Sequence, residues 1–255
     1  MKKHISIFLL LSLITTSCIF KQQKQTDILV LPSDEIVMHY DKENFYMPIL
    51  DAIINDTLPF KVFFDTGVAS NWIIASDSIK RELNSRDSAK VQIGKSSMLM
   101  PIDYIESNRT SVFNILGKNS IIVGWEFFKD KVIKLSFDKQ YIHVYNTLPN
   151  VVEYSKTKIT VTPSSHLSIS IEVILQGKPM KDTIFIDTGN NGYASFSTEL
   201  AEKYGINTED AYYGKAMTNV GYYSGYSLPV DTIKIGEMYV ADKNMRVAFR
   251  PKTNN

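Results

Sequence analysis

The hydrophobic pattern of the chain occurs twice. Short apolar runs separated by Gly, Pro, Asn and Asp predict strands joined by tight turns. In each half, two such runs predict a hairpin whose second strand ends at an aspartate, Asp65 or Asp187. The matching segments are 48–54 with 170–176, and 62–64 with 184–186. An internal repeat of this kind predicts two units of one architecture in a single chain.

The sequences of the two halves are most similar around the two aspartates. The triplet Asp-Thr-Gly at 65–67 recurs at 187–189, an offset of 122 residues (187 minus 65). Each triplet is followed in register by a Ser-led segment that predicts a short helix, at 76–83 and at 197–204. Strand, triplet and helix therefore keep their order and spacing in both halves.

Beyond the helices the two halves differ. Val-Gln-Ile-Gly at 91–94 matches Ile-Lys-Ile-Gly at 233–236, an offset of 142 (236 minus 94), so the second half holds 20 extra residues (142 minus 122). This insertion is rich in Gly and Tyr, which predicts a mobile hairpin with Tyr222 and Tyr223 as contact residues. An alternative is that these tyrosines lie on an ordinary exposed strand.

The first half also continues further than the second. It adds an apolar turn at 121–128 and two strands at 132–137 and 141–145, whereas the sequence ends before equivalents could follow in the second half. Residues 146–160 predict a linker. We therefore expect a first lobe at 36–148 and a second lobe at 149–255 that is shortened at its C-terminal end.

The composition excludes several classes of protein. The chain has 255 residues, and 28 Lys and Arg against 27 Asp and Glu give a net charge of +1, so it lacks the basic footprint of a nucleic-acid-binding protein. Hydrophobic residues make up 44%, which excludes wholesale disorder. A single Cys excludes an intramolecular disulfide framework and a Cys-rich metal site.

The N-terminus predicts export. A basic head precedes a ten-residue apolar run at 5–14, which is short for a membrane span and typical of a signal peptide. The following Cys18 resembles the lipidated residue of a bacterial lipoprotein, although Thr15 stands where that family prefers Leu. The resemblance implies a signal peptide at 1–17, a tether at 18–35 and a lipid-anchored protein of the cell envelope. An ordinary cleaved signal with an incidental Cys is the alternative.

The paired triplets resemble those of the bilobal aspartic peptidases of the pepsin and retropepsin group. The similarity covers about residues 40–250 and includes the apolar-apolar-Gly segment at 122–124. It implies an all-β fold of two pseudo-symmetric barrel lobes with a few short helices. A single Asp-Thr-Gly more often marks a plain turn in which Asp bonds nearby amides, but two copies in matching contexts favour the family.

The resemblance assigns Asp65 and Asp187 to a catalytic dyad. Two carboxylates about 3 Å apart cannot both ionise, so the pair holds one proton. The ionised member takes a proton from a water while the protonated member donates to the scissile carbonyl, without a covalent intermediate. This chemistry implies neither a metal nor an organic cofactor. The pair titrates as a unit, so the sequence does not assign the proton to either residue.

Five residues are expected to support this dyad. In the family, Thr66 and Thr188 bond to the opposite lobe through their hydroxyl groups. Gly67 and Gly189 let the backbone pass close behind the carboxylates. Asn190 follows the second triplet, where the family usually has Ser or Thr.

Three departures from the family pattern have consequences. Val68 replaces a hydroxyl residue after the first triplet, which predicts a raised pKa in the dyad and work nearer neutral pH. The first half is too short for a flap, so we expect the hairpin around 215–227 to cover the cleft. The missing closing strands leave a gap beside Asp187, and the segments 27–30 or 36–40, a second copy of the chain, or nothing would fill it.

The leading interpretation is an aspartic endopeptidase that hydrolyses peptide bonds in protein substrates. It would be held by an N-terminal lipid and face the periplasm or the cell surface, as a monomer or a homodimer. The alternative is a non-catalytic envelope lipoprotein that binds peptides or other ligands with the same fold. An unrelated β-rich envelope lipoprotein is a third interpretation.

Overall fold

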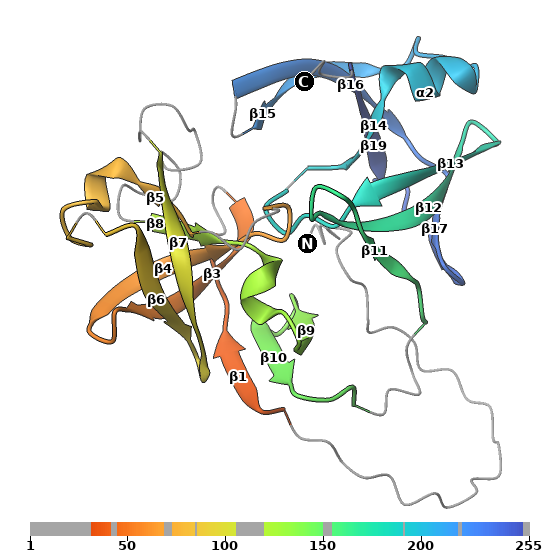
Figure 1. The fold of residues 1–255 in the computed structure, drawn as a ribbon. Coiled ribbons are helices and arrows are strands. Elements are labelled where there is room, and N and C mark those ends of the chain that lie inside the picture. Colours follow the sequence, from red (N-terminus) through yellow and green to blue (C-terminus); the bar gives the residue numbers. More distant parts are fainter. Residues whose placement is uncertain are drawn as a thin grey trace, which may run out of the picture.

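The computed structural model describes residues 32–41, 45–68, 73–84, 86–105, 120–149, 155–190, 192–218 and 221–251. Strands dominate these residues and form two lobes (Figure 1). The predicted all-β fold with two lobes and few helices is therefore confirmed. Signal peptide, Cys18 and most of the predicted tether lie outside the described residues.

Lobe one is built on a closed six-stranded barrel. Its strands are β3 (Phe45–Ile54), β4 (Leu58–Phe64), β5 (Ile73–Ser76), β6 (Ser88–Ile93), β7 (Ser96–Ile105) and β8 (Ser120–Val123). They pair in the order β3-β4-β8-β5-β7-β6, and β6 returns to β3. The β8 strand lies between β4 and β5, parallel to the first and antiparallel to the second. Because both of its partners are distant in sequence, the place of β8 in the barrel was not evident from local pattern.

The barrel interior follows from two-residue periodicity. Along β6, Ala89, Val91 and Ile93 are buried while Lys90 is exposed, as expected of a strand with one face on the core. The same alternation in neighbouring strands gathers one continuous apolar cluster inside the lobe. A one-residue shift of register would turn that set outward, so the pattern fixes the pairing.

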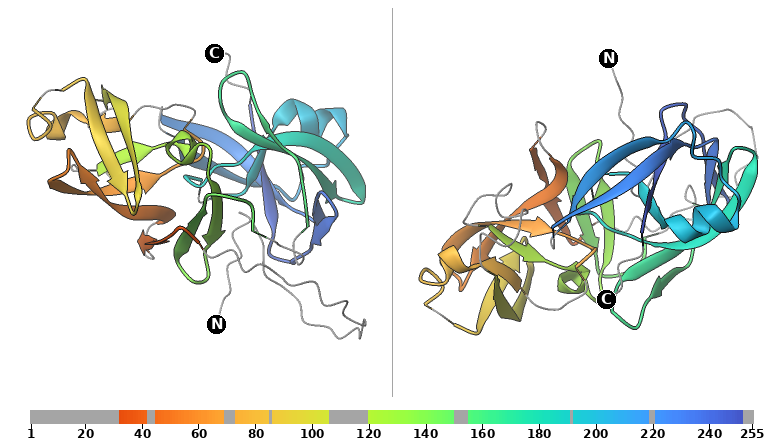
Figure 2. Two further views of the ribbon diagram at one scale, coloured as in Figure 1. Left: turned by 60° about the horizontal axis from the view of Figure 1, so that its bottom comes forward. Right: turned by 90° about the horizontal axis from the view of Figure 1, so that it is seen from above.

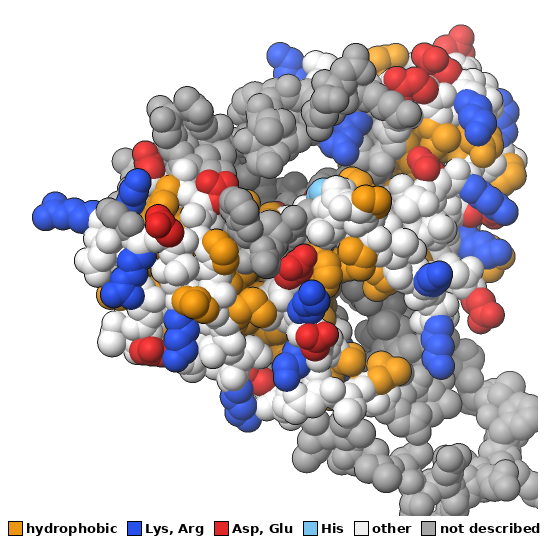
Figure 3. Space-filling view, in the orientation of Figure 1, with side chains coloured by type: hydrophobic (Ala, Val, Ile, Leu, Met, Phe, Trp, Pro, Cys, Tyr) orange, Lys and Arg blue, Asp and Glu red, His pale blue; other side chains and the backbone are white. Residues whose placement is uncertain are grey.

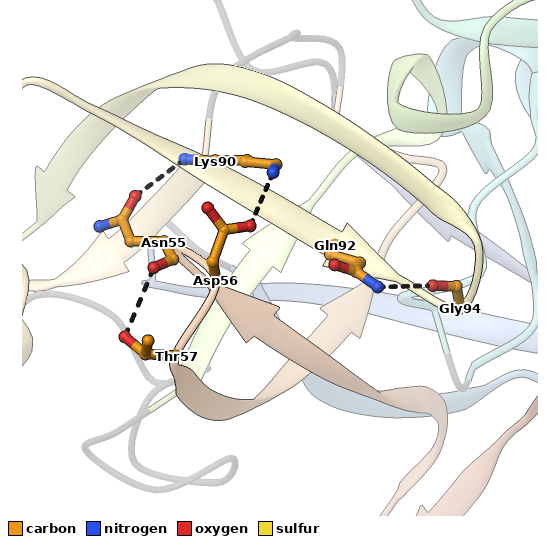
Figure 4. Close-up of polar contacts among 6 residues, drawn as sticks. All are labelled: Asn55, Asp56, Thr57, Lys90, Gln92 and Gly94. Carbon is orange, nitrogen blue, oxygen red and sulfur yellow. Dashed lines mark hydrogen bonds and ion pairs between the residues drawn. The ribbon is translucent and has the colours of Figure 1, made fainter.

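The turn between β3 and β4 closes the barrel (Figure 4). Asn55 accepts a hydrogen bond from the Lys90 backbone N–H at 3.1 Å and donates its own N–H to the Lys90 carbonyl at 2.8 Å. Lys90 Nζ also contacts Asp56 Oδ1 at 2.6 Å. Asn55 and Asp56 have φ angles of 50° and 65°, in the left-handed region that Asn and Asp tolerate better than most residues. The Asn55-Asp56 turn therefore also joins β3 to β6 through Lys90.

A small sheet stands beside the barrel. It contains β1 (Asp34–Val37), β10 (Tyr141–Tyr145) and β9 (Val132–Ser136), paired in that order. A 3-10 turn, η2 (Trp125–Phe128), leads from β8 into it. The β2 strand (His39–Asp41) pairs with β3. The tether prediction to residue 35 was therefore too long, and the segment 36–40 belongs to lobe one, so it does not fill the gap in lobe two.

Lobe two repeats part of this plan as a half-barrel. One sheet contains β11 (Ile159–Val161), β12 (Leu167–Leu175), β13 (Lys178–Phe185), β17 (Thr232–Ile235) and β18 (Met238–Val240). The other runs in the order β14 (Ala194–Ser197), β19 (Arg246–Arg250), β16 (Gly221–Pro229) and β15 (Tyr212–Thr218). The α2 helix (Thr198–Lys203) is capped by Ser197, whose Oγ accepts from Leu200 N at 3.2 Å. The predicted linker, 146–160, runs two residues too far, because β11 begins at Ile159.

The two lobes are related element by element. The hairpin β12–β13 corresponds to β3–β4, β14 to β5, and the parallel pair β14–β19 to β5–β7. The first predicted helix is only a 3-10 turn, η1 (Asp77–Ile79), where lobe two has α2. In the described part of lobe two, no strand lies between β13 and β14 as β8 does in lobe one. Both further views show the two lobes side by side (Figure 2).

We expect the Asn55 bond to stabilise lobe one measurably. Asn55→Gly keeps the left-handed conformation but removes the side-chain bond to Lys90, and should lower the free energy of unfolding by about 1 kcal/mol. Asn55→Ala adds backbone strain and should lower it by about 2 kcal/mol. Urea unfolding measures both. Thr57→Ala, which removes a 3.4 Å exposed contact with the Asn55 carbonyl, serves as the near-neutral control. Equal effects of all three variants would contradict this account.

Candidate active site

The two Asp-Thr-Gly loops meet between the lobes and are joined by hydrogen bonds of Thr66 and Thr188, which we call the threonine lock. Thr66 Oγ1 accepts from Thr188 N at 2.9 Å and donates to the Ile186 carbonyl at 2.8 Å. Thr188 Oγ1 accepts from Thr66 N at 3.0 Å and donates to the Phe64 carbonyl at 2.8 Å. Both threonines are buried, with 3% and 4% of their surface exposed. The four bonds are reciprocal, so the lobes meet about a local two-fold axis.

The glycines place the carboxyl groups opposite each other. Gly67 N donates to Asp65 Oδ1 at 2.8 Å, and Gly189 N donates to Asp187 Oδ1 at the same distance. A Cβ atom on Gly67 would lie 2.6 Å from Asp187 Cγ, and one on Gly189 would lie 2.6 Å from Asp65 Oδ2. Each carboxyl group therefore packs against the opposite glycine, where a larger residue would collide with it.

The Asp65 carboxyl group has a strongly perturbed pKa. Desolvation is the largest cause, followed by the charge of Asp187 and a side-chain hydrogen bond with Asp187, and together they raise the pKa of Asp65 well above 3.8. The N–H groups of Gly67 and Gly189 act in the opposite direction. Although part of Asp65 remains exposed, protein atoms enclose its carboxyl group closely enough for desolvation to dominate. A hydrogen bond between two carboxyl groups requires one proton between them.

The residues that follow the two triplets play smaller parts. Val68 N donates to the Asp65 carbonyl at 3.1 Å, and Asn190 N donates to the Asp187 carbonyl at 3.3 Å. The side chain of Asn190 bonds to Gly192 N and the Tyr193 carbonyl, so it stabilises its own loop, and its support of the dyad stays a prediction. The rise in the pKa of Asp65 has the predicted direction, and its largest cause is burial.

The two aspartate loops have different neighbours. Asp65 N donates to the Val123 carbonyl at 3.0 Å, so the end of β8 holds the first loop from behind. Lobe two has no counterpart of β8 among the described residues. Instead, Trp125 of η2 donates from Nε1 to the Ser165 carbonyl at 2.8 Å and so connects the end of β8 to lobe two. Trp125 is half-buried.

The inserted residues of lobe two form the predicted hairpin. Strands β15 and β16 pair antiparallel from Tyr212–Ser227 to Thr218–Gly221. At its base, the ring of Tyr226 contacts Tyr213 at 5.6 Å and stacks on Phe249 at 5.2 Å. Tyr222 and Tyr223 belong to β16, but their side chains lie outside the described part of the structure.

No cluster of three or more His, Cys, Asp or Glu side chains suited to a metal ion occurs among the described residues. Comparison with models of known protein families and with curated proteins finds no match to this chain. Its chemistry must therefore be argued from the carboxyl pair and its surroundings.

We expect the threonine lock to stabilise the contact between the lobes. Thr66→Val removes a hydroxyl that satisfies two buried backbone groups and should lower the free energy of unfolding by about 3 kcal/mol. Thr66→Ser keeps both bonds and should cost about 1 kcal/mol or less, for the lost methyl group. Urea unfolding of Thr66→Val, Thr188→Val and the double variant should give a non-additive result, because the residues share one network. Strict additivity would contradict a shared lock.

The raised pKa of Asp65 predicts how stability depends on pH. The native state keeps its proton at pH values where the unfolded chain, with a pKa near 3.8, has lost it. The contribution is complete below that value and is lost as pH rises toward the native pKa, so the free energy of unfolding should fall across this interval. In Asp65→Asn, the free energy of unfolding should fall less over this interval. Chemical unfolding at a series of pH values measures the difference.

Asp51→Asn provides the control of opposite sign. The pKa of Asp51 is lowered, chiefly by a hydrogen bond from Lys61, so its stabilisation is lost as pH falls. In Asp51→Asn, the free energy of unfolding should still fall as pH rises above 3.8. An unchanged pH dependence in Asp65→Asn would show that the carboxyl pair is not the source.

Proposed function

We propose that the chain is an aspartic endopeptidase that hydrolyses peptide bonds with a water activated between Asp65 and Asp187. The observation that supports this best is the carboxyl pair itself, with each carboxyl group packed against the opposite glycine. The reciprocal threonine bonds hold the two loops in this arrangement. Such a site needs side chains from both lobes, and the sequence repeat supplies them.

The chemistry follows from the shared proton. One carboxylate removes a proton from the attacking water, and the protonated partner donates to the carbonyl oxygen of the scissile bond. A raised pKa keeps this singly protonated state populated to higher pH than two isolated carboxyl groups would, which supports activity nearer neutrality. The hairpin β15–β16 would close over the substrate from lobe two.

The cellular setting is proposed from the N-terminal sequence. Cys18 would carry a lipid that holds the protein to a bacterial membrane, with the two lobes in the envelope, facing the periplasm or the cell surface. Within the described residues, no helix has the length and apolar character needed to cross a bilayer. Peptides or unfolded proteins would be the substrates, and the enzyme would act as a monomer or a homodimer.

A non-catalytic peptide-binding protein is the second candidate. The asymmetry behind the two loops favours it, because Val123 holds Asp65 while the described residues of lobe two offer no strand equivalent to β8. A less constrained Asp187 would bind peptides in the same place without efficient turnover.

Cleavage of an unstructured protein distinguishes the two candidates. The full chain should degrade reduced casein, and Asp65→Asn and Asp187→Asn should each lower the rate by at least about a hundredfold, because either variant removes the shared proton state. A statine-type inhibitor should block the wild type. The control variant Asp182→Asn neutralises an exposed carboxylate on β13 and should keep full activity. Casein binding without cleavage by the folded wild type would favour the binding protein.

A further inference from the structure

Besides the carboxyl pair, lobe two presents a polar and basic face next to the hollow between the lobes. The sheet β14–β19–β16 turns one face to the core of lobe two, where Phe196, Leu228 and Phe249 are buried. Strand alternation places the neighbouring residues on the other face. These are Ser195 of β14, Ser227 of β16, and Arg246, Ala248 and Arg250 of β19.

The register groups these residues around one small side chain. Ala248 lies opposite Ser195 on one side and opposite Ser227 on the other. Arg246 and Arg250 are two positions before and after Ala248, on the same face of β19. Two serines and two arginines therefore neighbour a position that carries only a methyl group. We name this set, Ser195, Ser227, Arg246, Ala248 and Arg250, the basic face.

Arg246 is held in a fixed orientation. Its Nε donates to Ser227 Oγ at 3.0 Å and its Nη2 donates to the Ser227 carbonyl at 2.7 Å. A guanidinium group has five N–H donors, so these bonds leave others for a ligand, and a planar fork suits a carboxylate. On the same face, Ser195 Oγ is buried and has no hydrogen-bond partner among the described residues. Buried hydroxyl groups normally have a partner, so Ser195 Oγ still has hydrogen-bonding capacity to satisfy on this face.

The basic face is turned toward the place where a peptide would lie. In the ribbon view, β14, β19 and β16 lie together in the upper part of lobe two, and the β15–β16 end of this sheet extends toward lobe one (Figure 1). In the space-filling view, the surface is hollowed between the lobes, and a Lys or Arg side chain lies near the hollow on the lobe-two side (Figure 3). The β14 strand begins five residues after Gly189, so the face adjoins the Asp187 loop.

We infer that the basic face binds the carboxylate of an Asp or Glu side chain in an extended peptide, so that the chain selects acidic peptides. The inference rests on the proposed function, since it names the substrate class of the same cleft. Arg246 supplies the fork, and the serine hydroxyls supply further donors around Ala248. The bond is charge-assisted and lies at a partly buried site, which makes it stronger than an exposed ion pair.

Binding is tested separately from cleavage. The full chain with Asp65→Asn is immobilised and exposed to an equimolar mixture of two randomised decapeptide libraries. One library carries Asp and Glu where the other carries Asn and Gln, and mass spectrometry measures the ratio retained. We expect about tenfold enrichment of acidic peptides. Adding Arg246→Gln should bring the ratio close to one. Lys181→Gln, which neutralises an exposed lysine on β13, should leave the enrichment unchanged.

The outcomes separate the inference from the proposed function. Acidic enrichment that depends on Arg246 supports the inference even if the wild type cleaves nothing. Cleavage by the wild type without acidic preference, or a preference that survives Arg246→Gln in a variant with native thermal unfolding, overturns the inference and leaves the peptidase proposal standing. Retention of neither library overturns it as well. Arg250→Gln gives a second measurement on the same face if Arg246→Gln does not fold.

Discussion

The contact between the lobes depends on two hydroxyl groups. Thr66 and Thr188 each accept a backbone N–H and donate to a backbone carbonyl of the other lobe, in surroundings from which water is excluded. A buried polar group costs most when it loses its partner, so neither loop can move away without leaving several groups unpaired. The facing carboxyl groups are a consequence of this constraint. Their mutual repulsion is tolerated because the loops that carry them are fixed by other bonds and because a proton can be shared.

Glycine is required on the same grounds. Any Cβ at Gly67 or Gly189 would fall within 3 Å of the opposite carboxyl group, so the aspartates could not approach. Each triplet thus combines three demands: an acid, a hydroxyl that crosses to the other lobe, and the absence of a side chain. Each triplet acts on the triplet of the other lobe. A single copy would therefore satisfy none of these demands. This explains why the repeat is most faithful at these positions and diverges elsewhere.

The sequence predicted the parts of the structure that depend on local pattern. The hairpins before Asp65 and Asp187, the Ser197 cap and the inserted hairpin all follow from periodicity and turn residues. Long-range pairing was harder to predict. Nothing near 34–41 indicates that β1 pairs with β10 or β2 with β3, and Trp125 carries no local signal that its indole bonds to Ser165. Its position after the triplet also gave no sign that the Asn190 amide closes its own loop.

The equivalent walls of the two lobes differ in chemistry. Ile74 on β5 occupies the position of Ser195 on β14, each on the strand face turned away from its core, and Ile74 pairs with Ile122 of β8. Lobe two has no counterpart of β8 in its described part and carries Arg246 and Ser227 nearby. One wall is therefore apolar and the other basic, although the carboxyl groups between them are nearly symmetric. An extended peptide has a direction, and a symmetric cleft would accept it either way round. Under the proposed function, unequal walls would remove that ambiguity and so favour one direction of the bound peptide.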